Sequence, residues 1–313
     1  MRALPALLLL CTACPGPADV QLAPPRAGFQ LATEAFAVKK GEELQRCYFF
    51  RVPGNGQDPL LVARIVAAVN PGSHHMNVFR VKTVQQLDGE SGAVVDGGEC
   101  WRSSNWADWP LVFNSQQGGE TVDWALPATV VQKFLPGEKL MLQTHYVNAS
   151  TQGTPGRGKA IVNFEQAKGA GPFQELGTVF ATDQQIKVCP GETRSFAQTC
   201  LFARKPVTIL AANGHFHSRG VKFEMAPVDA HNAPGPLFYT STEWADPLFS
   251  RDLAVPVSEG GGVLFRCTFS LPADGCADPA NACCATFGPH VETQEHCNAF
   301  VYYYPKLDDA TCF

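Results

Sequence analysis

Short runs of β-branched and aromatic residues, separated by Gly, Pro and Asn, recur along this 313-residue chain. In the run 262–269, Val, Phe, Cys and Phe occupy every second position, which is typical of a strand with one buried face. The other runs of this kind are 60–69, 139–147, 160–164, 206–212, 221–225 and 298–304. Long helical periodicity is missing from the sequence, so the pattern predicts an all-β fold.

The stretch 166–174, Gln-Ala-Lys-Gly-Ala-Gly-Pro-Phe-Gln, has the composition of a linker. Because 45% of the residues are hydrophobic and only 17% are charged, the chain is globular and long enough for about two cores. We therefore expect two β-sandwich domains, at 31–168 and 169–313. The 24 basic against 29 acidic residues, without any basic run, argue against nucleic acid as a partner.

The N-terminus resembles a bacterial lipoprotein signal. Met1-Arg2 is followed by an apolar run at 4–10 and by small residues that end at Cys14. We expect a signal peptide at 1–13, a lipidated Cys14 and a proline-rich spacer arm over 14–30; an ordinary secretory signal is the alternative. Either signal exports the chain, and no other apolar run reaches the ~18 residues that a membrane helix needs.

Twelve cysteines without a CxxC motif indicate an oxidising compartment. Removing Cys11 with the signal and assigning Cys14 to a lipid leaves ten, an even number that fits a fully disulfide-bonded fold.

Histidines in or beside the strand-like runs indicate metal binding, since imidazole is the commonest protein ligand for copper and zinc. His215 and His217 would point to one face of a strand, with Cβ atoms about 7 Å apart, while Phe216 faces the other way. His74 and His75 need a bend to share an ion, and the sequence 70–72, Asn-Pro-Gly, could supply it. Solvent-facing histidines are the alternative for both motifs. His231 and His290 lie in Gly/Pro-rich loops, and we expect them at the surface.

Together with their flanks, these motifs resemble a known family. They are Ser73-His74-His75-Met76, Leu142-Gln143-Thr144-His145-Tyr146, His215-Phe216-His217 and Glu295-His296-Cys297-Asn298. Their order and approximate spacing over 43–312 are similar to those of the copper type II, ascorbate-dependent monooxygenases, which include peptidylglycine α-hydroxylating monooxygenase and dopamine β-monooxygenase.

The resemblance implies two consecutive antiparallel jelly-roll β-sandwich domains, each presenting one copper to a solvent-filled cleft between them. The ligands that it implies for the first copper are His74, His75 and His145. For the second copper it implies His215 and His217, with a third ligand that is methionine in the family and His296 here. A third imidazole suits Cu(II) and zinc better than a soft thioether does, so it should lower the potential of the site and could slow O₂ activation. A histidine unrelated to metal is the alternative for His296.

The substrate positions also depart from the family. Where peptide-amidating members have an arginine and a tyrosine that hold the substrate carboxylate, this chain has Asn213 and Phe300; Asn298 is retained. Without the guanidinium a bidentate carboxylate clamp cannot form, so peptidylglycine is a poor candidate for the substrate. Gln143 matches a family position thought to form substrate-side hydrogen bonds, and an ordinary strand glutamine is the alternative.

The family disulfides map onto Cys47 with Cys100, Cys200 with Cys312, and Cys267 with Cys297. The last bridge would hold the strand that carries His296. Four cysteines remain, Cys189, Cys276, Cys283 and Cys284, and excluding the strained adjacent pair leaves two connectivities open.

The sequence therefore predicts an exported copper-dependent monooxygenase with two coppers per chain. It would hydroxylate a C–H bond of a small molecule with O₂ and a one-electron reductant such as ascorbate, as a monomer that contacts a membrane only through its lipid anchor. A non-catalytic copper-binding lipoprotein of the same fold is the main alternative, and a zinc-loaded structural or hydrolytic protein is a further one. Hydrolysis needs a carboxylate base beside the metal, and strand alternation turns Glu295 away from His296.

Overall fold

The computed structural model describes residues 19–82, 90–97, 100, 109–148 and 156–312. These residues form an all-β fold of 25 strands and one short 3-10 turn, η1 (Pro279–Asn281). The predicted fold class is confirmed at this level. In β21 (Gly262–Ser270) Val263, Phe265, Cys267 and Phe269 are buried while Arg266 is exposed, as the two-residue period predicted.

Three sheets contain the strands of the first half of the chain. The largest has the order β1-β12-β4-β9-β13, with β8 paired to β4: β1 (Gly28–Ala32), β12 (Ala160–Gln166), β4 (Leu60–Val69), β9 (Val130–Phe134), β13 (Gln174–Glu175) and β8 (Thr121–Ala125). The second has the order β6-β3-β10-β5-β7: β6 (Val94–Asp96), β3 (Glu43–Arg51), β10 (Lys139–Val147), β5 (Ser73–Arg80) and β7 (Leu111–Ser115). The third pairs β11 (Gly156–Gly158) with β2 (Phe36–Val38).

Three more sheets contain the strands of the second half. The first has the order β20-β17-β24-β14-β25: β20 (Val255–Val257), β17 (Val207–His215), β24 (Asn298–Tyr304), β14 (Gly177–Thr182) and β25 (Ala310–Cys312). The second has the order β16-β21-β18-β19: β16 (Thr193–Leu201), β21, β18 (Gly220–Val228) and β19 (Tyr239–Ser241). The third joins β15 (Lys187–Val188), β22 (Ala285–Phe287) and β23 (Gln294–Glu295).

Within the described residues, strand ladders join β1–β13 among themselves and β14–β25 among themselves. We call these two groups the first and second halves. The expected boundary lay at residue 168, but β13 (Gln174–Glu175) still pairs with β9, so the ladders of the first half extend to Glu175.

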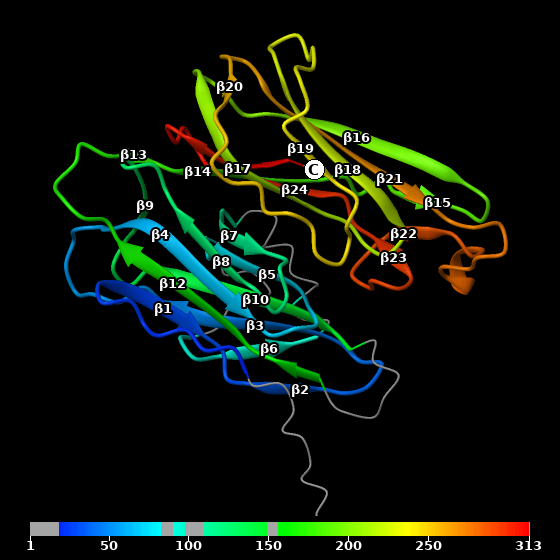
Figure 1. Ribbon diagram of the computed structural model, residues 1–313, viewed down its shortest axis with the longest axis horizontal. Helices are drawn as coiled ribbons and strands as arrows, with labels where there is room; N and C mark the ends of the chain where they lie inside the picture. Colours follow the sequence, from blue (N-terminus) through cyan, green and yellow to red (C-terminus); the bar gives the residue numbers. More distant parts are fainter. Residues whose placement is uncertain (1–18, 83–89, 98–99, 101–108, 149–155, 313) are drawn as a thin grey trace, which may run out of the picture.

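The edge strand β7 of the first half lies against β14 and β24 of the second (Figure 1). The backbone N–H of Asn114 donates to the Tyr302 hydroxyl at 2.8 Å, and the Thr178 hydroxyl donates to the carbonyl of Leu111 at 2.7 Å. Trp124 packs edge-on against Tyr302, with ring centroids 5.1 Å apart. Buried hydrogen bonds and aromatic packing therefore fix the two halves against each other beside the histidine-bearing strands.

Five disulfides link the ten described cysteines. They join Cys47 with Cys100, Cys200 with Cys312, Cys267 with Cys297, Cys189 with Cys284, and Cys276 with Cys283. The first three are the pairs that the resemblance implied, and the last two settle which of the open connectivities this structure adopts. Disulfides of this number belong to an oxidising compartment outside the cytosol, so the protein is exported.

The expected signal peptide, Cys11 and the lipidation site Cys14 lie outside the described residues. Within the described part of the chain, no helix has the length and apolar character needed to cross a bilayer.

Candidate metal centre

All six histidines that were predicted as metal ligands meet in one buried cluster, and none is more than 5% exposed. The cluster comprises His74 and His75 on β5, His145 on β10, His215 at the end of β17, His217 two residues later, and His296 between β23 and β24. Four chain segments from both halves therefore contribute to it. The two histidines expected at the surface, His231 and His290, are exposed and lie outside the cluster.

A β-bulge lets the adjacent histidines of β5 reach the same place. His75 pairs with His145 on β10, while the next pair of the ladder is Ser73 with Tyr146, so His74 is the extra residue. A bulge re-aims a side chain that regular alternation would send to the opposite face. The bend that lets His74 and His75 face one site therefore lies at His74 itself, within β5, rather than at the upstream sequence 70–72.

The motif His215-Phe216-His217, called the HxH motif below, is positioned by the end of β17. His215 and His217 have ring centroids 5.2 Å apart, and Phe216 faces the core of the second half, where it stacks on Phe223. The turn that follows is closed by the N–H of Gly220, which donates to the carbonyl of His217 at 2.9 Å.

Contacts between the two halves run through the middle of the cluster. The ring centroid of His74 lies 4.7 Å from that of His215 and 5.1 Å from that of His217, and His75 lies 5.0 Å from His215. One ligand nitrogen from each of His74, His215 and His217 falls within 4.8 Å of the others. The histidines that the resemblance divides between two copper sites are therefore in contact with one another here.

In the first half, a chain of hydrogen bonds engages His75 and His145. The Asn77 amide lies 3.3 Å from His75 Nδ1, His75 Nε2 lies 3.2 Å from His145 Nδ1, and His145 Nε2 lies 2.7 Å from Glu43 Oε1. An amide N–H can only donate and a carboxylate can only accept, so the protons follow one direction along this chain, toward Glu43.

Glu43 also contacts the second half. Its Oε1 accepts the backbone N–H of Val291 at 3.0 Å, and its Oε2 lies 3.7 Å from His290 Nδ1. Burial raises the pKa of Glu43, but the hydrogen bond and charge of His145 and the Val291 N–H outweigh burial, and the net shift is downward. Glu43 therefore lies ionised between a cluster histidine and the opposite half.

In the second half, His215 is oriented by Gln116, a residue of the first half. Gln116 Oε1 lies 2.6 Å from His215 Nδ1, and the Gln116 amide donates to Asn213 Oδ1 and to the carbonyl of Gly214. The Gln116 oxygen is an acceptor, so Nδ1 of His215 carries the proton. His215 Nε2 is then an acceptor and faces His296 Nδ1 at 3.1 Å.

His217 is fixed in the same tautomer by its own half. Its Nδ1 lies 2.9 Å from the carbonyl oxygen of Gln294, so Nδ1 donates and Nε2 keeps its lone pair. The oxygens of the Glu295 carboxyl group accept the backbone N–H groups of His217 at 2.9 Å and Arg219 at 2.8 Å. Burial raises the pKa of Glu295 to about 8. Glu295 therefore anchors the backbone of the turn that carries His217.

Burial keeps five of the six cluster histidines uncharged. It holds the pKa of His74, His75, His215 and His296 well below the usual range, with the charge of neighbouring imidazoles as the second cause. Burial likewise lowers the pKa of His217 to about 3. These rings are neutral at physiological pH, the form that binds a metal.

The donor set fits a transition-metal ion. Nε2 of His74 and Nε2 of His217 are buried and have no hydrogen-bond partner among the described residues. A buried polar atom without a partner costs about 1–3 kcal/mol, and a metal ion at these nitrogens would remove that cost. Neutral imidazoles with fixed tautomers suit Cu(II) or Zn²⁺.

Three of the four predicted substrate positions line a cavity of about 20 Å³ beside the cluster. Its lining includes Gln143, Asn298 and Phe300, together with Phe180 stacked on Phe300. The fourth position, Asn213, is buried beneath Gln116 and does not line it. A space of this size holds one water.

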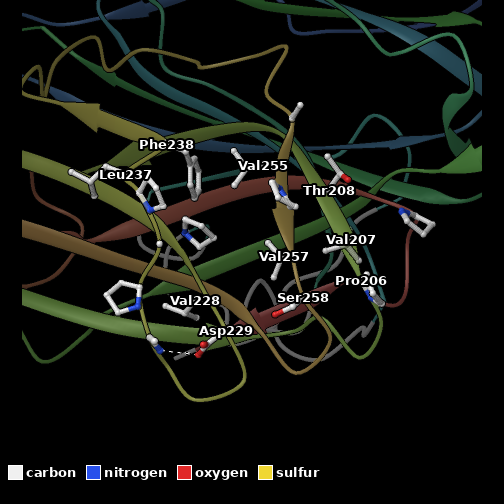
Figure 2. Close-up of a pocket in the computed structure, with 18 residues that line it drawn as sticks. Pro206, Val207, Thr208, Val228, Asp229, Leu237, Phe238, Val255, Val257 and Ser258 are labelled. Atoms are coloured by element: carbon white, nitrogen blue, oxygen red, sulfur yellow. Dashed lines mark hydrogen bonds between the residues drawn. The ribbon is translucent and has the colours of Figure 1, made fainter.

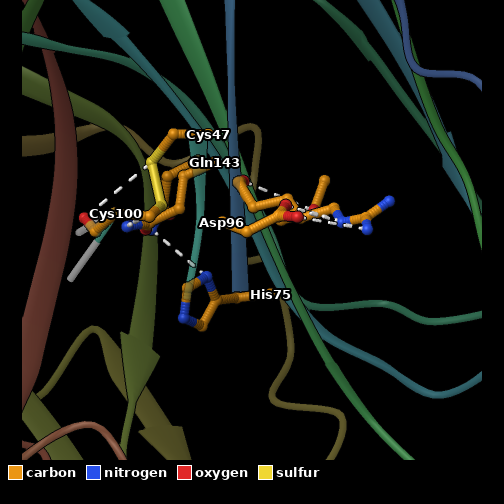
Figure 3. The surroundings of a disulfide bond; sticks show 8 residues. Cys47, His75, Asp96, Cys100 and Gln143 are labelled. Carbon is orange, nitrogen blue, oxygen red and sulfur yellow. Dashed lines mark hydrogen bonds and ion pairs between the residues drawn. A yellow bond between two sulfur atoms is a disulfide. The ribbon is translucent and has the colours of Figure 1, made fainter. Parts of the chain in front are cut away.

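Gln143 is held between the cluster and a disulfide. Its Oε1 accepts from Asn77 at 3.0 Å, and its amide lies 3.9 Å from Cys100 Sγ. Figure 3 shows Gln143 beside the Cys47–Cys100 bridge, with His75 nearby.

A larger cavity lies elsewhere, in the second half. It has a volume of about 1090 Å³ between β17, β20 and the chain that follows β18, and no cluster histidine lines it (Figure 2). Its wall is mostly aliphatic and proline-rich, with Val207, Val257 and Phe238 pointing inward.

Sequence reasoning missed Gln116, Glu43 and Asn77. Asn77 could have been found, because it lies two residues after His75 on one strand and so shares a face with it. Gln116 carries no local signal: it is the first Gln of a Gln-Gln-Gly-Gly sequence, and its partner His215 is 99 residues away.

No protein-family model and no curated protein matches the chain. Among solved structures it is similar to the quasi-atomic model of the PBCV-1 virus capsid, with 8% identity, 90% of this chain and 95% of that chain covered, and a TM-score of 0.25. It is also similar to the PBSX exported protein XepA (7% identity, 90% and 89% covered, TM-score 0.22) and to the infectious bursal disease virus VP2 subviral particle (11%, 92% and 74%, 0.22). We base no functional conclusion on likeness at this level.

Proposed function

We propose that the protein is an exported copper-dependent monooxygenase that acts on a C–H bond of a small, uncharged molecule. The observation that carries this proposal is the meeting of six buried histidines from four chain segments. Such a cluster leaves lone pairs unpartnered in the core unless it binds metal. The motif resemblance supplies the choice of copper and of the reaction.

Copper, when bound, supplies one-electron redox chemistry and the reduction of O₂. The resemblance divides the ligands into His74, His75 and His145 for one copper and His215, His217 and His296 for the other. In the reaction, one oxygen atom of O₂ enters the C–H bond and the other leaves as water. Two protons and two electrons are consumed, the electrons coming from a reductant such as ascorbate.

The protein's own groups orient the ligands. Gln116 and the carbonyl of Gln294 hold the Nδ1 protons of His215 and His217, so that both rings present Nε2. Glu43 accepts a hydrogen bond from Nε2 of His145 and so fixes the orientation of that ring. Burial keeps the rings of His215 and His217 neutral, so copper binding at these two needs little proton release at neutral pH.

The substrate would enter where the small cavity now lies. Phe180 and Phe300 form its apolar wall, while Gln143 and Asn298 supply amide groups. Neither Lys nor Arg is among its described lining residues, which favours an uncharged substrate over a carboxylate. Entry requires the contact between the halves to open, since the present space holds only one water.

The proposal also covers the domain type, the oligomeric state and the membrane anchor. The two halves would be consecutive jelly-roll domains, the protein a monomer, and Cys14 a lipid anchor at a bacterial membrane. Residues 19–27 would then be the end of the spacer arm.

A second candidate is a non-catalytic copper-binding lipoprotein. Two observations favour it: the closed cavity beside the cluster and the third imidazole at His296. A site without the thioether binds Cu(II) well but activates O₂ poorly.

Oxygen consumption by the copper-loaded mature chain with ascorbate separates the two candidates. Wild type, His296→Met and the surface control His231→Ala are compared at matched total copper, with free copper as the background. Consumption above free copper in wild type and in the control supports the enzyme. Two coppers bound, no consumption in wild type and consumption only in His296→Met would show that the natural protein is not an oxygenase.

A further inference from the structure

Resting on the proposed copper function, we propose that His74, His215 and His217 form a metal site of their own, which joins the two halves of the chain and takes the first metal ion. This ligand set differs from the two sets that the resemblance implied, because it takes ligands from both of them. It consists of one histidine from the first half and two from the second.

Geometry selects these three side chains. One ligand nitrogen from each lies within 4.8 Å of the others. A tetrahedral ion at Zn–N distances of about 2.0–2.1 Å holds its ligand nitrogens about 3.3 Å apart. Side-chain rotation by roughly an ångström therefore closes the site, without any movement of the strands.

Hydrogen bonding favours His74 and His217, and His215 joins them by exchanging the 3.1 Å contact of its Nε2 with His296 Nδ1 for the ion. Nε2 of His74 and of His217 are buried without a partner among the described residues, and Gln116 and Gln294 turn the lone pairs of His215 and His217 to Nε2. By contrast, both nitrogens of His75 and of His145 already belong to the chain that runs from Asn77 to Glu43. Recruiting those two rings would break existing hydrogen bonds.

The site has a functional consequence. A single ion held by both halves keeps the contact between them shut, with the substrate cavity at the size of one water. A second ion, which needs His75, His145 and His296, then requires the cluster to divide. One-metal protein is therefore a closed resting form, and two-metal protein is the form that can open.

The test is a titration of the metal-free, disulfide-intact mature chain with Zn²⁺ alone, in competition with a chromophoric chelator, below one equivalent. We expect His74→Ala, His215→Ala and His217→Ala to weaken binding of the first ion by at least about 100-fold, as expected for loss of one of three ligands. His75→Ala and His145→Ala should change it by less than about fivefold, and His231→Ala should not change it.

A second measurement keeps the test independent of folding. His74→Gln and His217→Asn retain side-chain volume, and each variant is checked for five disulfides by intact mass and for a wild-type circular dichroism spectrum. Zinc X-ray absorption at half an equivalent should show three imidazoles in wild type and two in either of these variants.

Loss of the first ion in His75→Ala and His145→Ala, with His215→Ala unaffected, would overturn the joining site and leave the proposed copper function intact. If wild type binds neither Zn²⁺ nor Cu²⁺, both proposals are wrong.

Discussion

Gln116 Oε1 lies 2.6 Å from Nδ1 of His215, so a residue of the first half fixes the tautomer of a cluster histidine in the second. The same side chain donates to Asn213 and to the carbonyl of Gly214. One fully buried amide thus links the assembly of the metal centre to the contact between the halves.

Replacing Gln116 by Leu should weaken both properties. His215 loses its acceptor, so we expect metal affinity to fall by about 10- to 100-fold. Leaving the buried His215 N–H and the Gly214 carbonyl without this partner should lower the free energy of unfolding by about 1–3 kcal/mol. Chelator competition and urea unfolding measure the two effects. Gln117→Leu, on the neighbouring half-buried residue, is the matched control and should change neither.

The Cys267–Cys297 bridge should contribute to metal affinity as well as to stability, because Cys297 lies between His296 and Asn298. Its closed loop spans 30 residues, for which the chain-entropy model gives roughly 3.5 kcal/mol. We expect the Cys267→Ser/Cys297→Ser variant to lose about that much stability and also metal affinity.

Removal of Cys276–Cys283, which spans 7 residues, is the comparison. It should cost roughly 2.5 kcal/mol by the same model and leave metal binding unchanged. Equal metal affinity in both double variants would contradict a role of Cys297 in placing His296.

Gly220 ends the turn after His217, and a methyl group there would overlap the Phe216 ring. Relief of this overlap must displace the backbone that carries the HxH motif, so Gly220→Ala should cost about 1–3 kcal/mol and reduce metal binding. Gly56→Ala, at an exposed position where the nearest atom to a new Cβ is 3.8 Å away, should be nearly neutral. Thermal unfolding of both variants measures the loss of stability, and metal titration measures the loss of binding.

Asp19 ties the N-terminal segment of the described residues, 19–27, to the fold. Its carboxylate accepts from Arg157 at 2.8 and 2.6 Å and from Asn70 at 3.0 Å, and these hydrogen bonds, that of Arg157 first, lower its pKa from the ordinary value of 3.8. A lowered carboxyl pKa means that attachment is complete above pH 3.8 and is lost as the pH falls below it.

Amide protection of Val20, whose N–H donates to Asn70 Oδ1 at 2.8 Å, reports on this attachment. Protection factors in wild type should be constant from pH 7 to 5 and decline below pH 3.8. In Asp19→Asn they should be low throughout. A wild-type profile in the variant would mean that the segment 19–27 is held by other contacts.

The sequence predicts most clearly what depends on local pattern. Alternation located the single buried face of β21, and the facing of Phe216 against the two HxH histidines follows from the same period. It could not locate the bulge, because every residue of β5 is buried and the strand has no polar face that would reveal its register.

Long-range packing accounts for the rest. The union of two expected sites into one cluster depends on how the halves meet, and contacts such as Asn114 with Tyr302, 188 residues apart, have no local signature. The pairing of Cys283 and Cys284 with different partners depends on backbone at positive φ, 52° at Ala282 and 62° at Cys283, which turns the neighbouring side chains apart. Positive φ in non-glycine residues is set by the surrounding structure.

The place of β24 in its sheet has a consequence for biogenesis. β24 lies between β14 and β17, although it follows β17 by more than 80 residues and does so after all of β18–β23. While the chain emerges from a translocation channel, β14 and β17 therefore have no common neighbour until residues 298–304 arrive. The second half must therefore complete its central sheet after nearly all of its residues have crossed the membrane, and that sheet stays unfinished during most of the passage.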